Sequence, residues 1–353
     1  MEQASKLEQG SADLLAGKIT LARLFGLYLA HHSPRKTADE QGEDRRRVEL
    51  WIRVLGADKN PHKIIRRELE AFVEARRSGG INARGHAQPP EKQRPVRARP
   101  VEADVNWLRW LCNWATEWQE ESGRHLMREN PLRGFTPPTE KNPRRPVASD
   151  DRYEAVRAVA DQVVMEIRWD GHRRERRSYL AEILDLVAGT GRRITPVCFL
   201  RAEDLRLPAT PATPHGAIHW PAATDKMGRE STVPISPTVR AALIRVLEGR
   251  GIASGYLFPS PIDPDRPVNK DLVRQWLRQA ERLAKLEPQQ GSAWHAYRRG
   301  WATARKHLPL ADLAAAGGWK GTEALQRCYL HADEATMLDV VMSGAALREV
   351  RKA

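Results

Sequence analysis

Hydrophobic residues in the first 135 positions recur every three or four residues, the spacing that places them on one face of a helix. Three such series lie at positions 21–29, 48–55 and 64–73. A fourth series consists of Trp107, Trp110, Trp114 and Trp118. A stripe of this kind is most often the core seam of a helical bundle, and stacking on exposed nucleic-acid bases is the alternative. The pattern therefore predicts a small helical domain over residues 1–135.

Two stretches rich in proline and arginine break this pattern. The first, 78–100, contains Gly79, Gly80 and four prolines. Proline removes backbone hydrogen-bond donors and glycine adds chain entropy, so we expect a mobile basic loop there. The second stretch, 136–149, also contains four prolines, together with Arg144 and Arg145. We interpret it as a linker between two domains.

Helical and strand patterns are mixed after the linker. Helices are predicted at 152–164 and 179–188, and strands at 217–220 and 231–235 flank a turn marked by Gly228. A further helix begins at Ser236 and Pro237, because serine caps exposed amides and proline lacks only a donor that the first turn does not use. More helical patterns lie near 272–283, 294–306, 310–316, 322–330 and 334–350. We expect a mainly α fold with a small β-sheet, and a second domain over 150–353.

Charge narrows the choice of partner. The 353 residues include 58 Lys and Arg against 45 Asp and Glu, a net charge of +13 and a pI of about 9.9. This excess makes nucleic acid the first partner to consider, ahead of a membrane surface. The most apolar stretch, 179–189, is broken by Glu182 and Asp185, and the amino terminus lacks the order of a signal peptide. With three scattered cysteines, the sequence indicates a soluble cytoplasmic protein.

Several kinds of chemistry are disfavoured. The run Thr190-Gly191 begins like a phosphate loop, but no Gly-Lys-Ser/Thr follows. His215 and His219 have no cysteine or carboxylate close enough to complete a metal site. No Gly-x-Ser-x-Gly elbow occurs, and the acidic residues are scattered among basic ones. We therefore expect neither a metal nor a cofactor.

Six cationic, polar and aromatic residues remain as candidates, and each of them is ordinary alone. They are Arg193, Lys226, His295, Arg298, Trp319 and Tyr329. Surface arginines, a solvated turn lysine, a buried histidine and core aromatics would explain them without any function. The functional case rests on their order and their surroundings.

In that order the chain resembles the tyrosine recombinases of the phage-integrase family over about residues 148–347. The matching motifs are Thr190-Gly191-Arg192-Arg193 with Leu200 and Asp204-Leu205 downstream, Lys226 with Arg229 and Val233-Pro234-Ile235, His295-Ala296-Tyr297-Arg298-Arg299, Gly317-Gly318-Trp319, and Tyr329. The amino-terminal half resembles the helical core-binding domain of the family in its pattern only.

The resemblance implies a site-specific recombinase or integrase of a mobile element, which cuts and rejoins DNA through a covalent 3′-phosphotyrosine without metal or ATP. It implies catalytic roles for the six residues above. The implied partners are double-stranded DNA with a specific attachment site, further copies in a homotetramer, and an accessory DNA-bending or directionality protein. A bacterial, nucleoid-associated location follows. We expect phosphate contacts from Arg84, Lys92, Arg94, Arg97, Arg99, Arg144, Arg145, Arg229 and Arg299.

Two other functions stay open at this level. A DNA-binding protein of the same fold could have lost catalysis, although the complete set of six groups argues against that. A type IB topoisomerase uses the same arginine and tyrosine chemistry, and the helical amino-terminal half disfavours it. The amphipathic segment 334–350, with Met337, Leu338, Val341 and Leu347 as its apolar side, docks either on a neighbouring protomer or on its own domain.

Overall fold

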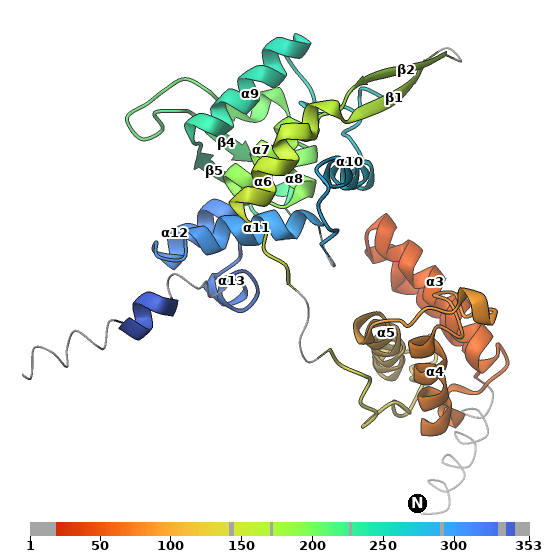
Figure 1. The fold of residues 1–353 in the computed structure, drawn as a ribbon. Helices are drawn as coiled ribbons and strands as arrows, with labels where there is room; N and C mark the ends of the chain where they lie inside the picture. Colours follow the sequence, from red (N-terminus) through yellow and green to blue (C-terminus); the bar gives the residue numbers. More distant parts are fainter. Residues whose placement is uncertain are drawn as a thin grey trace, which may run out of the picture. The chain divides into compact units, whose positions relative to one another are not determined.

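The computed structural model describes residues 19–140, 145–169, 172–225, 228–289, 293–330 and 337–342. The chain divides into two compact units, Met1–Pro143 and Arg144–Ala353 (Figure 1). The division falls inside the stretch that the sequence suggests as a linker. Within the described ranges, none of the helices is long and apolar enough to cross a membrane.

Within its described residues, 19–140, the amino-terminal unit contains a bundle of four α-helices, as the periodicity predicts. They are α2 (Leu21–His31), α3 (Ala38–Leu55), α4 (Arg66–Ser78) and α5 (Ala98–Glu117). Thr20 and Thr37 begin the first two helices by accepting a hydrogen bond from a first-turn amide. The apolar faces meet in one core, where Trp51 packs against Phe72 with the rings tilted by 45° and 4.4 Å between their centroids.

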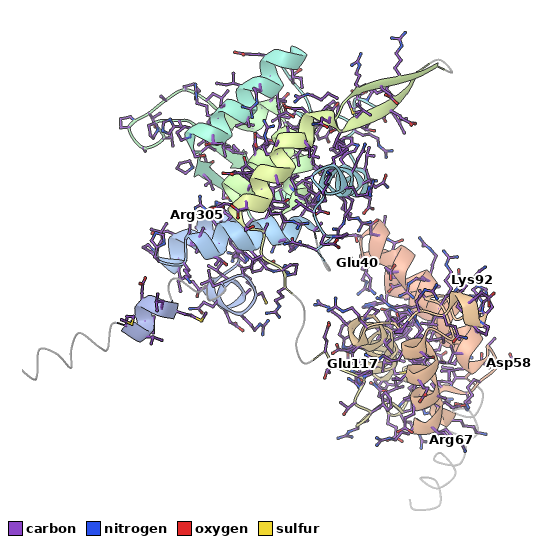
Figure 2. All side chains as sticks on the ribbon, viewed as in Figure 1. Glu40, Asp58, Arg67, Lys92, Glu117 and Arg305 are labelled. Atoms are coloured by element: carbon purple, nitrogen blue, oxygen red, sulfur yellow. The ribbon has the colours of Figure 1, made fainter. Side chains whose placement is uncertain are left out.

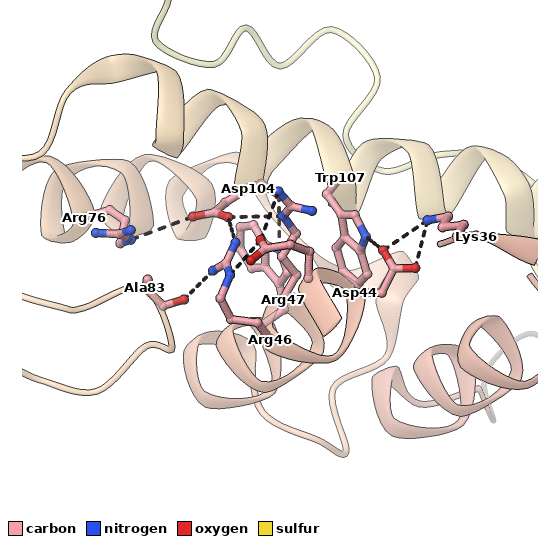
Figure 3. Close-up of polar contacts among 10 residues, drawn as sticks. Lys36, Asp44, Arg46, Arg47, Arg76, Ala83, Asp104 and Trp107 are labelled. Atoms are coloured by element: carbon pink, nitrogen blue, oxygen red, sulfur yellow. Dashed lines mark hydrogen bonds and ion pairs between the residues drawn. The ribbon is translucent and has the colours of Figure 1, made fainter. Parts of the chain in front are cut away.

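Two buried carboxylates tie α3 to α5 (Figure 3). Asp44 accepts hydrogen bonds from the Lys36 ammonium at 2.8 Å and from the Trp107 indole at 2.7 Å. Asp104 accepts one from Arg46 at 2.8 Å, and the guanidinium groups of Arg47 and Arg76 also lie within 4 Å. Each buried negative charge therefore has cationic partners, which offset the cost of removing it from water.

The tryptophan stripe on α5 is only partly a core seam. Trp107 is buried, and Trp114 and Trp118 pack against the core, but Trp110 is 65% exposed. Our expectation of one apolar seam is wrong for Trp110. At 100° per residue, Trp110 lies about 60° to one side of Trp107, whereas the other two lie within about 20° of it.

The basic segment 78–100 is held by specific contacts. Gly79 adopts a φ of +84°, and a Cβ there would meet the backbone of Arg94 at 2.2 Å. Arg46 donates to the Ala83 carbonyl at 2.5 Å, and a short 3₁₀ turn spans Pro90–Lys92. The mobility that we expect from its composition stays a prediction, but both ends of the segment are anchored to the bundle.

The carboxy-terminal unit surrounds one central helix, α7 (Leu180–Thr190), which packs against α9 (Pro237–Arg250) and α11 (Ala293–Ala304). Further labelled helices of its described residues are α6 (Asp150–Val159), α8 (Ile194–Cys198), α10 (Lys270–Leu283), α12 (Leu310–Gly317) and α13 (Thr322–Cys328). A small antiparallel sheet has the order β3 (Leu205–Arg206), β4 (Ala217–Trp220), β5 (Ser231–Pro234). The mainly helical fold with a small sheet is confirmed.

One hairpin in this unit is absent from our sequence prediction. The helix expected over 152–164 ends at Val159, and two antiparallel strands follow, β1 (Val164–Trp169) and β2 (His172–Arg177). Met165 on β1 is buried while its neighbour Glu166 is exposed, so this segment has the two-residue period of a strand. Figure 1 shows the hairpin projecting from the body, on the opposite side from α12 and α13.

Other local predictions for this unit are confirmed. Ser236 accepts from the Val239 amide at 3.3 Å and Pro237 is the first residue of α9. Gly228 has the left-handed φ of +64° that suits a turn. Residues 337–342 are helical, and the rest of the predicted helix 334–350, including Leu347, lies outside the described residues.

Candidate active site

Arg193 is placed by a glycine turn between α7 and α8. Gly191 ends α7 with a φ of +65°, and a Cβ at this position would lie 2.3 Å from the Trp301 ring. Only glycine fits both conditions. Arg193 is the N-cap residue just before α8, and its Nη1 lies 3.4 Å from the Gly318 carbonyl oxygen and 3.8 Å from the Asp225 carboxylate.

Arg298 on α11 is the most buried charged group of the site, with 1% of its surface exposed. Its Nη1 donates to the carbonyls of Gly191 and Gly317. Its guanidinium carbon lies 3.5 Å from the Trp319 ring centroid and 5.2 Å from that of Tyr329. One guanidinium therefore joins the turn after α7 to the loop after α12.

Tyr329 directly follows α13 and lies beside the same group of side chains. Its ring meets Trp319 edge-on at 4.9 Å between centroids and faces His295 at 6.4 Å. Thr303 on α11 donates to the Tyr329 carbonyl at 3.1 Å. The phenol and the Arg298 guanidinium are thus brought together within a single chain.

Three buried donors in this group have no hydrogen-bond partner within the described part of the chain. They are Nε and Nη2 of Arg298 and the indole Nε1 of Trp319. Buried donors are nearly always satisfied in folded proteins, so three at one place indicate room for a ligand that accepts hydrogen bonds. An anion with several oxygens fits this set of donors, because two of them belong to a guanidinium.

Burial and like charge shift the pKa values of the site. Burial lowers the pKa of the Arg298 guanidinium to about 9, and the charge of Arg193 acts in the same direction. Arg298 therefore stays charged at neutral pH. Burial also lowers the pKa of His295 to about 4, helped by the positive charges of Arg298, Arg299 and Arg193. His295 is accordingly a neutral imidazole at pH 7, which has one nitrogen able to accept a proton.

The comparisons with known proteins concern this part of the chain. Residues 165–336 match the model of the phage integrase family. This part of the chain belongs to that family of tyrosine recombinases. No curated protein sequence is significantly similar to it.

Solved structures of tyrosine recombinases share the fold over most of the chain. The Tn1549 transposon integrase in complex with circular intermediate DNA is 13% identical, with a TM-score of 0.63 over 92% of this chain and 99% of that one. A lambda integrase dimer bound to a COC′ core site is 15% identical, with a TM-score of 0.67 over 90% and 99%. A lambda integrase tetramer bound to a Holliday junction is 14% identical, with a TM-score of 0.66 over 89% and 78%.

The structure brings together five of the six predicted residues. Arg193, His295, Arg298, Trp319 and Tyr329 are joined by the contacts described above. Lys226 lies outside the described residues, as does Arg144.

Three of the predicted DNA-contacting arginines donate hydrogen bonds to backbone carbonyls near the candidate active site. Arg145 donates to the Arg327 carbonyl at 2.6 Å, Arg299 to that of Pro146 at 2.9 Å, and Arg229 to that of Lys320 at 3.1 Å. Arg145 thereby contacts the last turn of α13, and Arg229 contacts the chain two residues before this helix begins. Whether these groups also meet phosphate stays a prediction.

The other predicted DNA contacts belong to the amino-terminal unit. Arg97 is paired with Glu140, and Arg84 lies 3.7 Å from Glu49. Lys92 is exposed on the outside of this unit (Figure 2). The remaining members of the set, Arg94 and Arg99, are also exposed.

Sequence reasoning missed Arg192, Asp225 and Trp301. Asp225 is the carboxylate nearest to Arg193, and the Trp301 indole donates to the Gly189 carbonyl at 3.0 Å. Arg192 is buried next to Arg193. For Arg192 the sequence offers one signal, its position directly before Arg193. The sequence alone does not tell which of two adjacent arginines is buried. In the described ranges no cluster of histidine, cysteine, aspartate or glutamate could hold a metal ion.

Proposed function

We propose that this protein is a site-specific DNA recombinase that cuts and rejoins DNA strands through a covalent 3′-phosphotyrosine at Tyr329. The observation that carries the proposal is the buried Arg298 guanidinium, whose Nε and Nη2 have no hydrogen-bond partner of normal geometry among the described residues and whose central carbon lies 5.2 Å from the centroid of the Tyr329 ring. A phosphodiester placed there would satisfy those donors and put its phosphorus within reach of the phenol. The neighbouring Trp319 indole would supply a third donor.

Charge on the phosphate explains the choice of groups. The transition state of phosphoryl transfer spreads negative charge over the non-bridging oxygens. Arg193 and Arg298 have planar guanidinium groups, so each can donate two parallel hydrogen bonds to those oxygens. Preorganised donors of this kind typically contribute on the order of 3 kcal/mol each to the barrier reduction. Two arginines and an indole therefore supply most of the electrostatic stabilisation.

The phenol must lose its proton to attack. A neutral His295, facing the Tyr329 ring, is able to accept that proton, and Arg298 stabilises the phenolate that forms. The phenolate oxygen then forms a bond to phosphorus, and the bond between phosphorus and the 5′ oxygen breaks. We assign the proton that the departing oxygen needs to the Lys226 ammonium, as the general acid.

Rejoining is the same reaction in reverse. The 5′ hydroxyl of a second strand attacks the phosphotyrosine, its proton returns to the general acid, and the tyrosine leaves. One phosphoester bond is exchanged for another in each step, so no ATP is consumed.

DNA binding follows from the basic residues of both units. We propose that the helical unit over about 1–135 and the catalytic unit bind one duplex together, through phosphate contacts from the arginines and Lys92 named above, which makes the affinity fall steeply with salt. The solved relatives were captured as a dimer on a core site and as a tetramer on a Holliday junction. By analogy we propose a homotetramer on paired attachment sites of a mobile element, assisted by a DNA-bending or directionality protein.

A nicked suicide duplex that carries the attachment site tests the proposal. Cleavage next to the nick releases a short fragment, so the covalent adduct accumulates and survives SDS. We expect an adduct with the wild type and with Tyr297→Phe, a control from the same site helix, and none with Tyr329→Phe. Binding without any adduct in the wild type would instead identify an inactive DNA-binding protein. Relaxation of supercoiled plasmid without strand exchange between two sites would identify a topoisomerase.

A further inference from the structure

Arg192 lies between Gly191 and Arg193, and its guanidinium joins three elements of the catalytic unit. Nη2 donates to the Ser231 hydroxyl at 2.9 Å and lies 3.5 Å from the Ala315 carbonyl oxygen. The guanidinium carbon stacks 5.0 Å from the centroid of the Trp220 ring. The side chain is 5% exposed, so these contacts form in the interior.

Burying this arginine is costly. Desolvation lowers the pKa of the Arg192 guanidinium to about 10, and its Nε has no hydrogen-bond partner in the part of the chain that the structure describes. An apolar side chain of similar size would pack at this place without either penalty. The contacts of the guanidinium therefore need an explanation beyond packing.

Space for Arg192 is left by a glycine. Gly318 adopts a φ of +73°, and a Cβ on it would lie 2.2 Å from Arg192 Nη1. The next residue is Trp319, and the Gly318 carbonyl faces Arg193. Arg192 thus packs directly against the turn that carries the Gly318 carbonyl and the Trp319 side chain.

The other contacts of Arg192 lie at the two ends of one connection. Trp220 is the last residue of β4 and Ser231 is the first residue of β5. The chain between them, 221–230, includes Lys226. A single guanidinium therefore fixes both ends of the lysine-bearing connection relative to the turn before Trp319.

We propose that Arg192 is a positioning residue, which holds the β4–β5 connection against the α12 turn so that the lysine in that connection reaches the departing 5′ oxygen. This proposal rests on the proposed function, in which Lys226 is the general acid. It differs from a simple electrostatic role for the Arg192 charge. A lysine at position 192 keeps the charge but cannot hold Trp220, Ser231 and Ala315 with one planar group.

The test compares two leaving groups in single-turnover cleavage. One suicide duplex has the natural 5′ oxygen at the scissile phosphate, and the other has sulfur in that bridging position. A thiolate departs without a proton, so the sulfur duplex bypasses the general acid. We expect Arg192→Met and Arg192→Lys to cleave the oxygen duplex about 100-fold more slowly than the wild type, since small displacements of a catalytic group have effects of this size. Both should cleave the sulfur duplex within about threefold of the wild type.

Three controls separate the possible causes. Lys226→Ala should show the same pattern of loss and rescue. Arg298→Lys should cleave both duplexes slowly, because it acts on the non-bridging oxygens. Arg240→Met removes another partly buried arginine that donates to two carbonyls, those of Leu207 and His215, and should cleave both duplexes like the wild type. Urea denaturation of each variant shows that it is folded under the assay conditions.

Several outcomes would overturn the inference. If Arg192→Met cleaves the sulfur duplex as poorly as the oxygen duplex while Lys226→Ala is rescued, Arg192 does not position the acid. If Arg192→Lys matches the wild type, its charge alone suffices. If Lys226→Ala is not rescued, the assignment of the general acid in the proposed function fails instead.

Discussion

Two stacked tryptophans allow a direct test of the proposal that the Trp319 indole N–H donates to the phosphate. Trp301 and Trp319 lie 6.1 Å apart with an interplanar angle of 21°, and they are 8% and 5% exposed. Each also has an arginine over its ring, Arg305 for the first and Arg298 for the second. Replacing either with phenylalanine removes the same atoms from a similar environment. The difference is that the Trp301 indole donates to the Gly189 carbonyl, whereas the Trp319 indole has no partner in the described structure.

The two substitutions should therefore rank oppositely in stability and in activity. Loss of ring volume costs about 1–2 kcal/mol of unfolding free energy in each case. Trp301→Phe also leaves the Gly189 carbonyl without its donor, which adds about 1–3 kcal/mol. Trp319→Phe breaks no hydrogen bond among the described residues. It does remove a proposed donor to the phosphate, and loss of such a donor slows reactions by about 100-fold.

Urea denaturation gives the stabilities, and single-turnover cleavage of the suicide duplex, at urea-free conditions where both variants are folded, gives the rates. We expect Trp301→Phe to be the less stable variant and Trp319→Phe the slower one. If both variants lose cleavage equally, or if Trp319→Phe is at least as destabilising as Trp301→Phe, the assignment of the free indole to the phosphate is wrong.

Three further predictions concern pH, backbone and charge. The pKa of His295 is about 4 in the folded protein against about 6.5 when unfolded. Because the unfolded chain takes up this proton at a higher pH, the free energy of unfolding is unaffected by protonation of His295 above pH 6.5 and falls as the pH drops from 6.5 toward 4. In urea melts between pH 7 and 4.5, the wild type should lose up to about 3 kcal/mol more than His295→Gln; equal losses would contradict the shift. Gly191→Ala should lower the urea midpoint well beyond Gly251→Ala, because both glycines have a positive φ but only Gly191 meets a tryptophan ring; similar midpoints would show that this ring yields. Asp104→Asn should cost on the order of 3 kcal/mol in the same assay, since it removes the negative charge beside the buried Arg76 and the partly buried Arg46 and Arg47, while the exposed Asp58→Asn should cost almost nothing. A loss below about 1 kcal/mol for Asp104→Asn would show that water reaches those arginines.

Local patterns were enough to place most elements. The amino-terminal helices, the strands β4 and β5 and the capped start of α9 all follow from periodicity and end signals, because these reflect the geometry of the backbone itself. The order of the motifs was enough to recognise the family. The same kind of reasoning failed at the β1–β2 hairpin, where a two-residue period follows a helical one within a few positions.

What the sequence determined about this protein is therefore the kind of residue at each place and the elements that carry them. Only the tertiary structure decided which of these residues meet. Arg193 reaches Gly318, 125 positions away, and Arg192 rather than its neighbour turns into the core. Trp110 faces outward although it belongs to the same stripe as Trp107. The physical reason is that period and capping are properties of a few adjacent residues, whereas burial and hydrogen bonding depend on how distant segments pack.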